Sequence, residues 1–274
     1  MFPMINIGPL AIQSGGLILL LSIWIGIWIS DRFSKNLGTS SDNIENSILI
    51  ALLIGIVSAR IGFFLRNFNI FLENPLSIFS LSPSMLYVPF GILIGTLSGL
   101  IYAQKKGLPN LPTLDTLSPM LLIVFIGFQL ANFATGNIYG LPSNLPWAVP
   151  LWGAMRHPVQ IYAIILALGA FLILVILTKG LKKSGFMRSG ILFKLTITTL
   201  AIITIFSRAF VDNKALLAGV DTYQLFGFGI LLVGLIQLNK LCYQPRKHIG
   251  VLISMGANQN PKPNLALALK RLQS

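Results

Sequence analysis

The sequence predicts an all-α integral membrane protein of about seven transmembrane helices, with its amino end outside and its carboxy end in the cytoplasm. Of the 274 residues, 54% are hydrophobic and only 10% are charged, which leaves too few polar side chains to cover a water-soluble domain. Apolar runs of about 20 residues recur along the chain, and each is long enough to cross a bilayer. Basic residues gather in alternate segments between these runs, and this alternation predicts the orientation.

The apolar runs follow one another with short connections. The first run lacks a charged start and a small-residue cleavage site, so we expect it to remain in the mature protein. Residues 1–242 form the expected membrane domain, and residues 243–274 form a basic cytoplasmic tail. The expected spans are residues 12–30, 47–65, 85–103, 116–135, 160–178, 195–211 and 224–239.

The segments between the spans differ in charge. Residues 67–84, 137–158 and 213–223 contain few basic side chains and are expected outside. Prolines and two tryptophans in residues 137–158 favour irregular backbone at the outer surface rather than a helix, which gives a small outer loop region. The cytoplasmic segments contain Arg32 with Lys35, Lys105 with Lys106, residues 179–188, and the tail from Lys240 onward.

The net charge of +13 has a membrane explanation. In a soluble protein it would suggest nucleic acid as a partner, but here the basic residues orient the helices and contact anionic headgroups, so we expect no nucleic acid. Cys242 is the single cysteine, which excludes an internal disulfide and a multi-cysteine metal site. The chain also lacks a HExxH helix, a GxSxG elbow and a Walker loop, and we expect no metal or cofactor.

Arginines at membrane depth are the first functional candidates, because a charge inside a span is costly. Arg60 lies in the second span, and Arg156 and Arg208 lie near the outer ends of the fifth and sixth. Three guanidinium groups in the outer half of the membrane are suited to binding a lipid phosphate, or else each anchors its own helix. Arg208 and Asp212 are four residues apart, and such residues share one face of a helix and can form an ion pair.

Amide side chains mark the outer half of the fourth span. Gln129, Asn132 and Asn137 need hydrogen-bond partners there, either from neighbouring helices or from a polar ligand. His157 precedes Pro158 at the start of the fifth span, where a lone histidine is more often an interfacial hydrogen-bonding group than a catalyst.

Five motifs stand out along the chain: ARIGF at 59–63, Asp115 with Pro119, ANFATGNIYG at 131–140, RHPVQIY at 156–162, and SRAFVD at 207–212. Taken in order, they resemble the prolipoprotein diacylglyceryl transferase family over nearly the whole chain. Their order, their spacing and the predicted topology all agree with the family.

The resemblance implies a lipid substrate in the bacterial cytoplasmic membrane. Family members move diacylglycerol from phosphatidylglycerol to the lipobox cysteine of a lipoprotein precursor, which releases glycerol phosphate. Cationic groups would stabilise the leaving phosphate, and a base would help the thiol to ionise. By resemblance, Arg60, Asn132, Arg156 and Arg208 bind the phospholipid, and Gly140, His157, Gln160, Tyr162 and Asp212 support the site.

At four family positions, this chain carries a residue without the charged, titratable or hydroxyl group that the family has there. Phe90 stands where the family has the histidine of a His-Gly-Gly motif, so the most plausible base is absent. Gln129 replaces an arginine and Asn137 a glutamate, while Gly15 replaces a tyrosine of the first span. A milder change puts Asp212 where the family has a glutamate. Losing one charged contact in such a site costs about 2–4 kcal/mol of transition-state stabilisation.

Three functions remain open from the sequence, and the catalytic residues are not identified. The favoured one is a catalytically degenerate relative that keeps a phospholipid-binding frame and serves as an accessory or scaffold subunit of a membrane complex. The second is an active transferase with a substitute base. The third, a small lipid or solute transporter, rests only on the number of spans and the intramembrane arginines.

Overall fold

The structure is a computed structural model, and it describes residues 4–7, 10–69, 85–185, 187–212, 214, 216–217 and 220–243. The chain divides into two compact units, Met1–Ile236 and Gln237–Ser274. The expected tail lies outside the described residues except for residue 243, and so does most of the predicted outer segment at residues 67–84.

Seven helices make up most of the described chain. They are α1 (Ser14–Leu37), α2 (Ser41–Arg66), α4 (Val88–Lys105), α5 (Asn110–Thr135), α6 (Val159–Lys183), α7 (Ile191–Ala209) and α8 (Thr222–Tyr243). Six of the seven, all but α4, are long and apolar enough to cross a membrane. The predicted all-α membrane fold with about seven helices is therefore confirmed.

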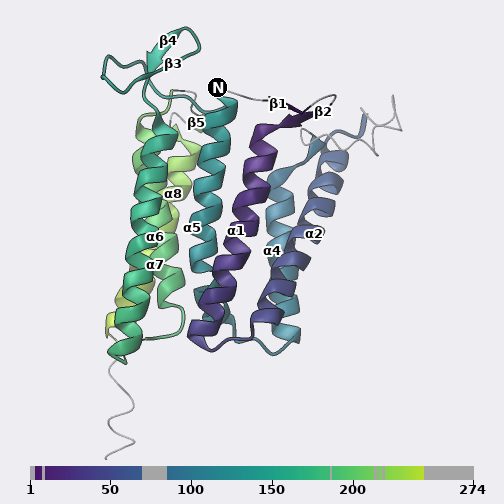
Figure 1. Cartoon of the computed structure of the whole chain (residues 1–274), viewed down its shortest axis with the longest axis vertical. Helices are drawn as coiled ribbons and strands as arrows, with labels where there is room; N and C mark the ends of the chain where they lie inside the picture. The colour runs from purple at the N-terminus through teal and green to yellow at the C-terminus, as the bar shows by residue number, and fades with distance from the viewer. Residues whose placement is uncertain are drawn as a thin grey trace, which may run out of the picture. The chain divides into compact units, whose positions relative to one another are not determined.

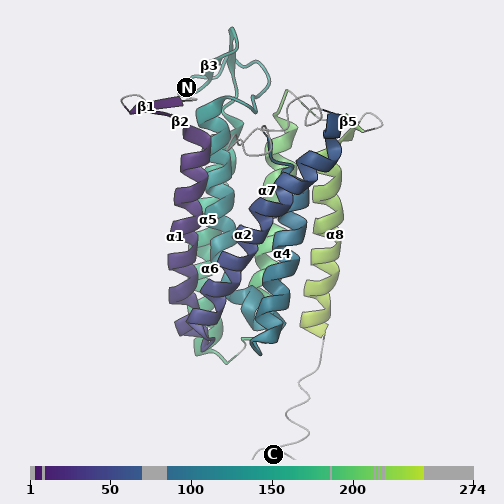
Figure 2. The ribbon, with the colours of Figure 1, turned by 90° about the vertical axis from the view of Figure 1, so that its right-hand side faces the viewer.

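Helix α5 is the element around which the first unit is built. Helix α1 packs along one side of α5, and α6 and α7 pack along the other, as Figure 1 shows. Helix α2 packs along α4, and the two cross in the view of Figure 2. Large apolar side chains point away from these contacts: Ile165, Leu172 and Ile176 of α6 are each more than 60% exposed, which suits a surface that contacts lipid.

Glycines bring α2 and α4 into backbone contact. A Cβ atom on Gly95 would lie 2.5 Å from the backbone oxygen of Ala51, and one on Gly91 would lie 2.6 Å from that of Gly55. Ser47 also donates a hydrogen bond from α2 to the backbone oxygen of Gly99, at 2.7 Å. Because small residues let two helix backbones approach closely, this pair is held by direct contact rather than by long side chains.

Three short antiparallel hairpins lie at one end of the helices (Figure 1). The prediction of irregular backbone in residues 137–158 was right in excluding a helix but missed the second of these hairpins. Its turn places Trp152 and Gly153 at positive φ, 53° and 76°, a conformation that apolar and proline patterns do not reveal. The pairs are β1 (Met4–Ile7) with β2 (Leu10–Gln13), β3 (Val149–Leu151) with β4 (Ala154–Arg156), and β5 (Leu216–Leu217) with β6 (Val220–Asp221).

The predicted span boundaries shift at several helix ends. The first span was placed from residue 12, but residues 10–13 form β2 and the helix begins at Ser14. Helix α5 begins at Asn110 rather than at residue 116, so Asp115 lies inside it. The buried Asp115 carboxylate accepts backbone N–H groups of Gly190, at 2.5 Å, and Phe193, at 2.9 Å. It thereby satisfies donors that the start of α7 would leave unpaired.

Candidate functional site

Three chain segments meet at the hairpin end of the helices and form the candidate site. The segment after α5 bonds to the segment after α7 through the Leu141 N–H and the Phe210 oxygen, at 2.8 Å, and through the Asp212 N–H and the Tyr139 oxygen, at 3.0 Å. The segment before α6 joins them through the His157 N–H and the Leu141 oxygen, at 3.1 Å. Backbone bonds thus bring three of the five motifs together.

Gly140 is the point of closest approach between these segments. A Cβ atom at this position would overlap the backbone oxygen and the Cβ of His157. Gly140 also pairs as an isolated antiparallel bridge with Val211. A glycine is therefore required for the segment after α5 to lie between the other two, which gives this predicted supporting residue a structural role.

Arg156 ties the three segments together with its side chain. Its Nε donates to the Leu151 oxygen at 3.1 Å, and its Nη1 donates to the Gly140 oxygen at 3.0 Å and to the Asp212 carboxylate at 2.6 Å. Its guanidinium also lies 4.7 Å from the centre of the Tyr139 ring. The acidic partner, whose side chain is 39% exposed, balances its charge.

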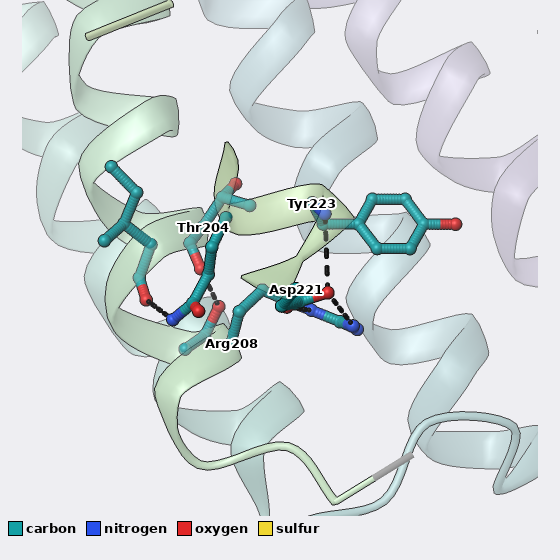
Figure 3. Close-up of polar contacts among 7 residues, drawn as sticks. Thr204, Arg208, Asp221 and Tyr223 are labelled. Carbon is teal, nitrogen blue, oxygen red and sulfur yellow. Dashed lines mark hydrogen bonds and ion pairs between the residues drawn. The ribbon is translucent and has the colours of Figure 1, made fainter. Parts of the chain in front are cut away.

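Arg208 forms a buried ion pair with Asp221, which Figure 3 shows in close-up. Its Nε and Nη2 donate to the two carboxylate oxygens at 2.6 and 2.8 Å. The expected pairing of Arg208 with Asp212 is wrong, because α7 ends at Ala209 and Asp212 lies beyond the helix face it was thought to share. The two acids are instead divided between the two arginines, Asp212 with Arg156 and Asp221 with Arg208.

His157 belongs to a hydrogen-bonded aromatic group. Its Nδ1 lies 3.1 Å from the Tyr162 hydroxyl, to which the Trp147 indole N–H donates at 2.9 Å. Gln160, also from the start of α6, is buried and donates its amide to the backbone oxygen of Ile138. These predicted supporting residues are thus brought together. An imidazole here can accept a proton, although its Nδ1 is engaged with a phenol.

The amide residues lie at the hairpin end of α5. Asn132 donates its Nδ2 to the Phe128 oxygen within the same helix, at 3.0 Å. Gln129 is half-buried, and Asn137, just past the helix, is exposed. The hydrogen bond that Asn132 donates therefore stays within its own helix and does not involve an arginine.

The remaining changed positions lie on other helices. Gly15 is buried on α1, where a Cβ would come within 3.1 Å of the Thr135 methyl group. Phe90 of α4 covers Gly62 of α2, so the aromatic ring fills the space beside the neighbouring helix. Both residues lie in contacts between helices, and neither has a titratable side chain.

Arg60 lies on α2 and is associated with the α2–α4 pair. Its Nη1 donates to the Met85 oxygen at 3.2 Å, just before the start of α4. This bond places Arg60 toward the same end as the other two arginines, but through a different set of elements.

Sequence analysis missed Asp221 and the hydrogen bonds that Trp147 and Trp152 donate. Asp221 was detectable as a rare acid at the start of the last span, and only the fold shows which arginine it meets. Trp152 donates its indole N–H to the Gly136 oxygen at 3.2 Å, which ties the tip of the β3–β4 hairpin to the end of α5. In the described part of the chain, no cluster of His, Cys, Asp and Glu side chains is suited to holding a metal ion.

Comparison with known proteins connects this site to a family. A sequence model of prolipoprotein diacylglyceryl transferases matches residues 3–239. The phosphatidylglycerol–prolipoprotein diacylglyceryl transferase of Clostridioides difficile is 30% identical over 177 residues, which is 62% of this chain and 68% of the relative. The enzyme of the same name from Finegoldia magna is 24% identical over 221 residues, which is 81% of this chain and 88% of the relative.

Proposed function

Because this chain belongs to the prolipoprotein diacylglyceryl transferase family and is a multi-pass protein of the bacterial inner membrane, we propose that it binds an anionic phospholipid without transferring its diacylglycerol. The ligand is phosphatidylglycerol, the lipid named for the relatives. The hairpin end faces outward, and the chain serves as an accessory or scaffold subunit of a membrane complex.

The observation that carries the absence of transfer is the charge balance at the site. Arg156 and Arg208 each have a carboxylate within 2.6 Å, so neither presents a net positive charge to a phosphate. Transfer of diacylglycerol breaks a bond to a phosphate, and the developing charge on that leaving group calls for unneutralised donors. An arginine that already holds an acid is a poor source of that stabilisation.

The changed positions support the same proposal. Phe90 and Gln129 are neutral where the family carries a histidine and an arginine, and Phe90 is committed to packing against Gly62. A frame that holds lipid tolerates such replacements. The reaction does not, because it requires both a base for the thiol and charge at the phosphate.

An active transferase is the second candidate, and His157 is the observation in its favour. Its imidazole is half-buried at the hairpin end, in contact with the Tyr162 hydroxyl, where it could take the proton of an incoming thiol. In that case His157 would stand in for the base that Phe90 removes.

A transfer assay separates the two candidates. Purified protein in phosphatidylglycerol vesicles is incubated with a lipobox peptide, and the thioether product is measured by mass spectrometry. The C. difficile transferase is the positive control, and the Arg208→Ala variant sets the background. We expect no product above that background, and product formed by the unaltered chain but not by Arg208→Ala contradicts the proposal.

The scaffold role has its own test. Purification in a mild detergent from the native membrane should bring down a partner protein in a fixed ratio. A chain that always purifies alone contradicts this part of the proposal and leaves lipid binding to be judged separately.

A further inference from the structure

We propose that Asp221 occupies the edge of Arg208 that a lipid phosphate would bind, so that the ion pair and phosphate binding exclude each other. This inference rests on the proposed lipid-binding function and concerns how that site is controlled. The ligand class is a phosphate ester, and Asp221 acts as an internal substitute for it.

The geometry of the pair is the first argument. Asp221 uses Nε and Nη2 of Arg208 together, with both carboxylate oxygens engaged at 2.6 and 2.8 Å. Phosphate oxygens are bound by arginine through the same kind of paired N–H donors. A carboxylate on this edge therefore blocks the bidentate arrangement that a phosphate needs there.

Burial is the second argument. The side chains of Arg208 and Asp221 are only 10% and 1% exposed, and the Tyr223 ring lies 4.7 Å from the guanidinium (Figure 3). The Tyr223 N–H also reaches the Asp221 carboxylate, at 3.4 Å. A phosphate cannot approach Arg208 closely while the acid and the aromatic ring cover it. Binding at Arg208 therefore requires the Asp221 carboxylate to move away.

The second arginine gives an internal contrast. Asp212 engages Arg156 through one oxygen, and its side chain is 39% exposed, so this carboxylate can turn into solvent, although the Arg156 side chain is itself only 13% exposed. Arg156 also keeps its bonds to two backbone oxygens without the acid. Among the described residues, the acid is buried in the Arg208 pair and exposed in the Arg156 pair, so the exchange with phosphate is expected to be controlled only at Arg208.

Native mass spectrometry of protein–lipid complexes tests this exchange. Phosphatidylglycerol retention is compared for the unaltered chain, Asp221→Asn and Asp212→Asn, with phosphatidylcholine as the zwitterionic reference. We expect Asp221→Asn to retain phosphatidylglycerol about tenfold more strongly, the effect of one recovered charge-assisted bond. We expect little change for Asp212→Asn. Unchanged or weaker retention by Asp221→Asn overturns the proposal, because the acid would then be neutral to binding or would position Arg208 for it.

If Asp221→Asn does not fold, amide hydrogen exchange in the unaltered chain provides a second test. Release of the carboxylate removes the acceptor of the Tyr223 N–H, so phosphatidylglycerol should speed exchange at Tyr223 while phosphatidylcholine should not. Inorganic phosphate alone is a third arm, and a response equal to that of the lipid assigns the site to a free phosphate. If none of the three ligands speeds amide exchange at Tyr223, the proposed replacement of Asp221 by phosphate is wrong. Amide exchange at Tyr223 does not depend on diacylglycerol transfer, so its result is independent of the transfer assay.

Discussion

The ion pair between Arg208 and Asp221 makes the hairpin end of α7 sensitive to acid. The hydrogen bond from Arg208 lowers the pKa of Asp221 below the ordinary value of an aspartate, and burial opposes that effect only in part. A carboxyl whose pKa is depressed in the folded state stabilises the fold above the unfolded pKa of about 3.9. That contribution is lost as the pH falls through the lower, folded value.

We therefore predict that Asp221→Asn lowers the unfolding temperature in detergent at pH 7, because it leaves the Arg208 charge buried without its partner. Breaking a buried pair in this way costs about 3–5 kcal/mol. The gap between the variant and the unaltered chain should narrow as the pH falls from about 4, where the unfolded carboxyl takes up a proton, through the lower folded pKa of Asp221. Thermal scans across this pH range measure both effects.

The control is Asp212→Asn, because this acid is 39% exposed and Arg156 keeps its hydrogen bonds to two backbone oxygens without it. If the difference in unfolding temperature does not change with pH, or if both variants lose the same amount, this account of Asp221 is wrong.

At this scale the sequence predicted which motifs lie together better than which side chains touch. Arg156, His157, Gln160 and Tyr162 lie close together because one motif carries them at the start of one helix. The partner of Arg208 was missed because the choice between Asp212 and Asp221 depends on where α7 ends. A hydropathy pattern does not fix a helix end to within three residues.

At the scale of elements, the contact between α2 and α4 depends on glycine. We predict that Gly95→Ala destabilises the protein by about 1–3 kcal/mol, because its new Cβ would meet the backbone of Ala51 and Gly55 at 2.5 and 2.9 Å. Backbone atoms cannot turn aside as a side chain can, so the helices must move apart. Thermal unfolding in one detergent measures the loss.

Gly169→Ala on α6 is the matched control. Apart from its chain neighbours and the nearby backbone of α6 itself, no atom lies within 4 Å of a Cβ at that position, so the variant should be neutral or slightly more stable, since alanine favours a helix by up to about 1 kcal/mol. Equal stability of the two variants would show that the α2–α4 approach is not tight.

Helix existence was predictable, whereas helix starts and hairpins were not. Apolar length identifies a span because the bilayer sets it, but Asp115 looked like the polar edge of a span and is in fact buried inside α5. Its carboxylate is satisfied by the start of α7, 75 residues later in the chain. Long-range partners of this kind leave no local pattern in the sequence.

At the scale of the whole molecule, the ends of the helices differ in charge. Lys35, Lys105 and Lys183 lie at or near helix ends opposite the hairpins, whereas the loop that carries β3 and β4 has no basic residue before Arg156. Positively charged segments stay on the cytoplasmic side during insertion. The hairpin end, with both acid–arginine pairs, is therefore expected to face outward.

Cysteine labelling tests this orientation in intact cells. With Cys242 replaced by serine, Asn144→Cys in the loop before β3 and Ser184→Cys after α6 place exposed thiols at opposite ends. A membrane-impermeant maleimide should label Asn144→Cys in spheroplasts and Ser184→Cys only after permeabilisation. The reverse pattern would put the arginine site on the cytoplasmic face. The proposed ligand would then bind from the cytoplasmic leaflet, and the proposal of an outward-facing lipid site would be wrong.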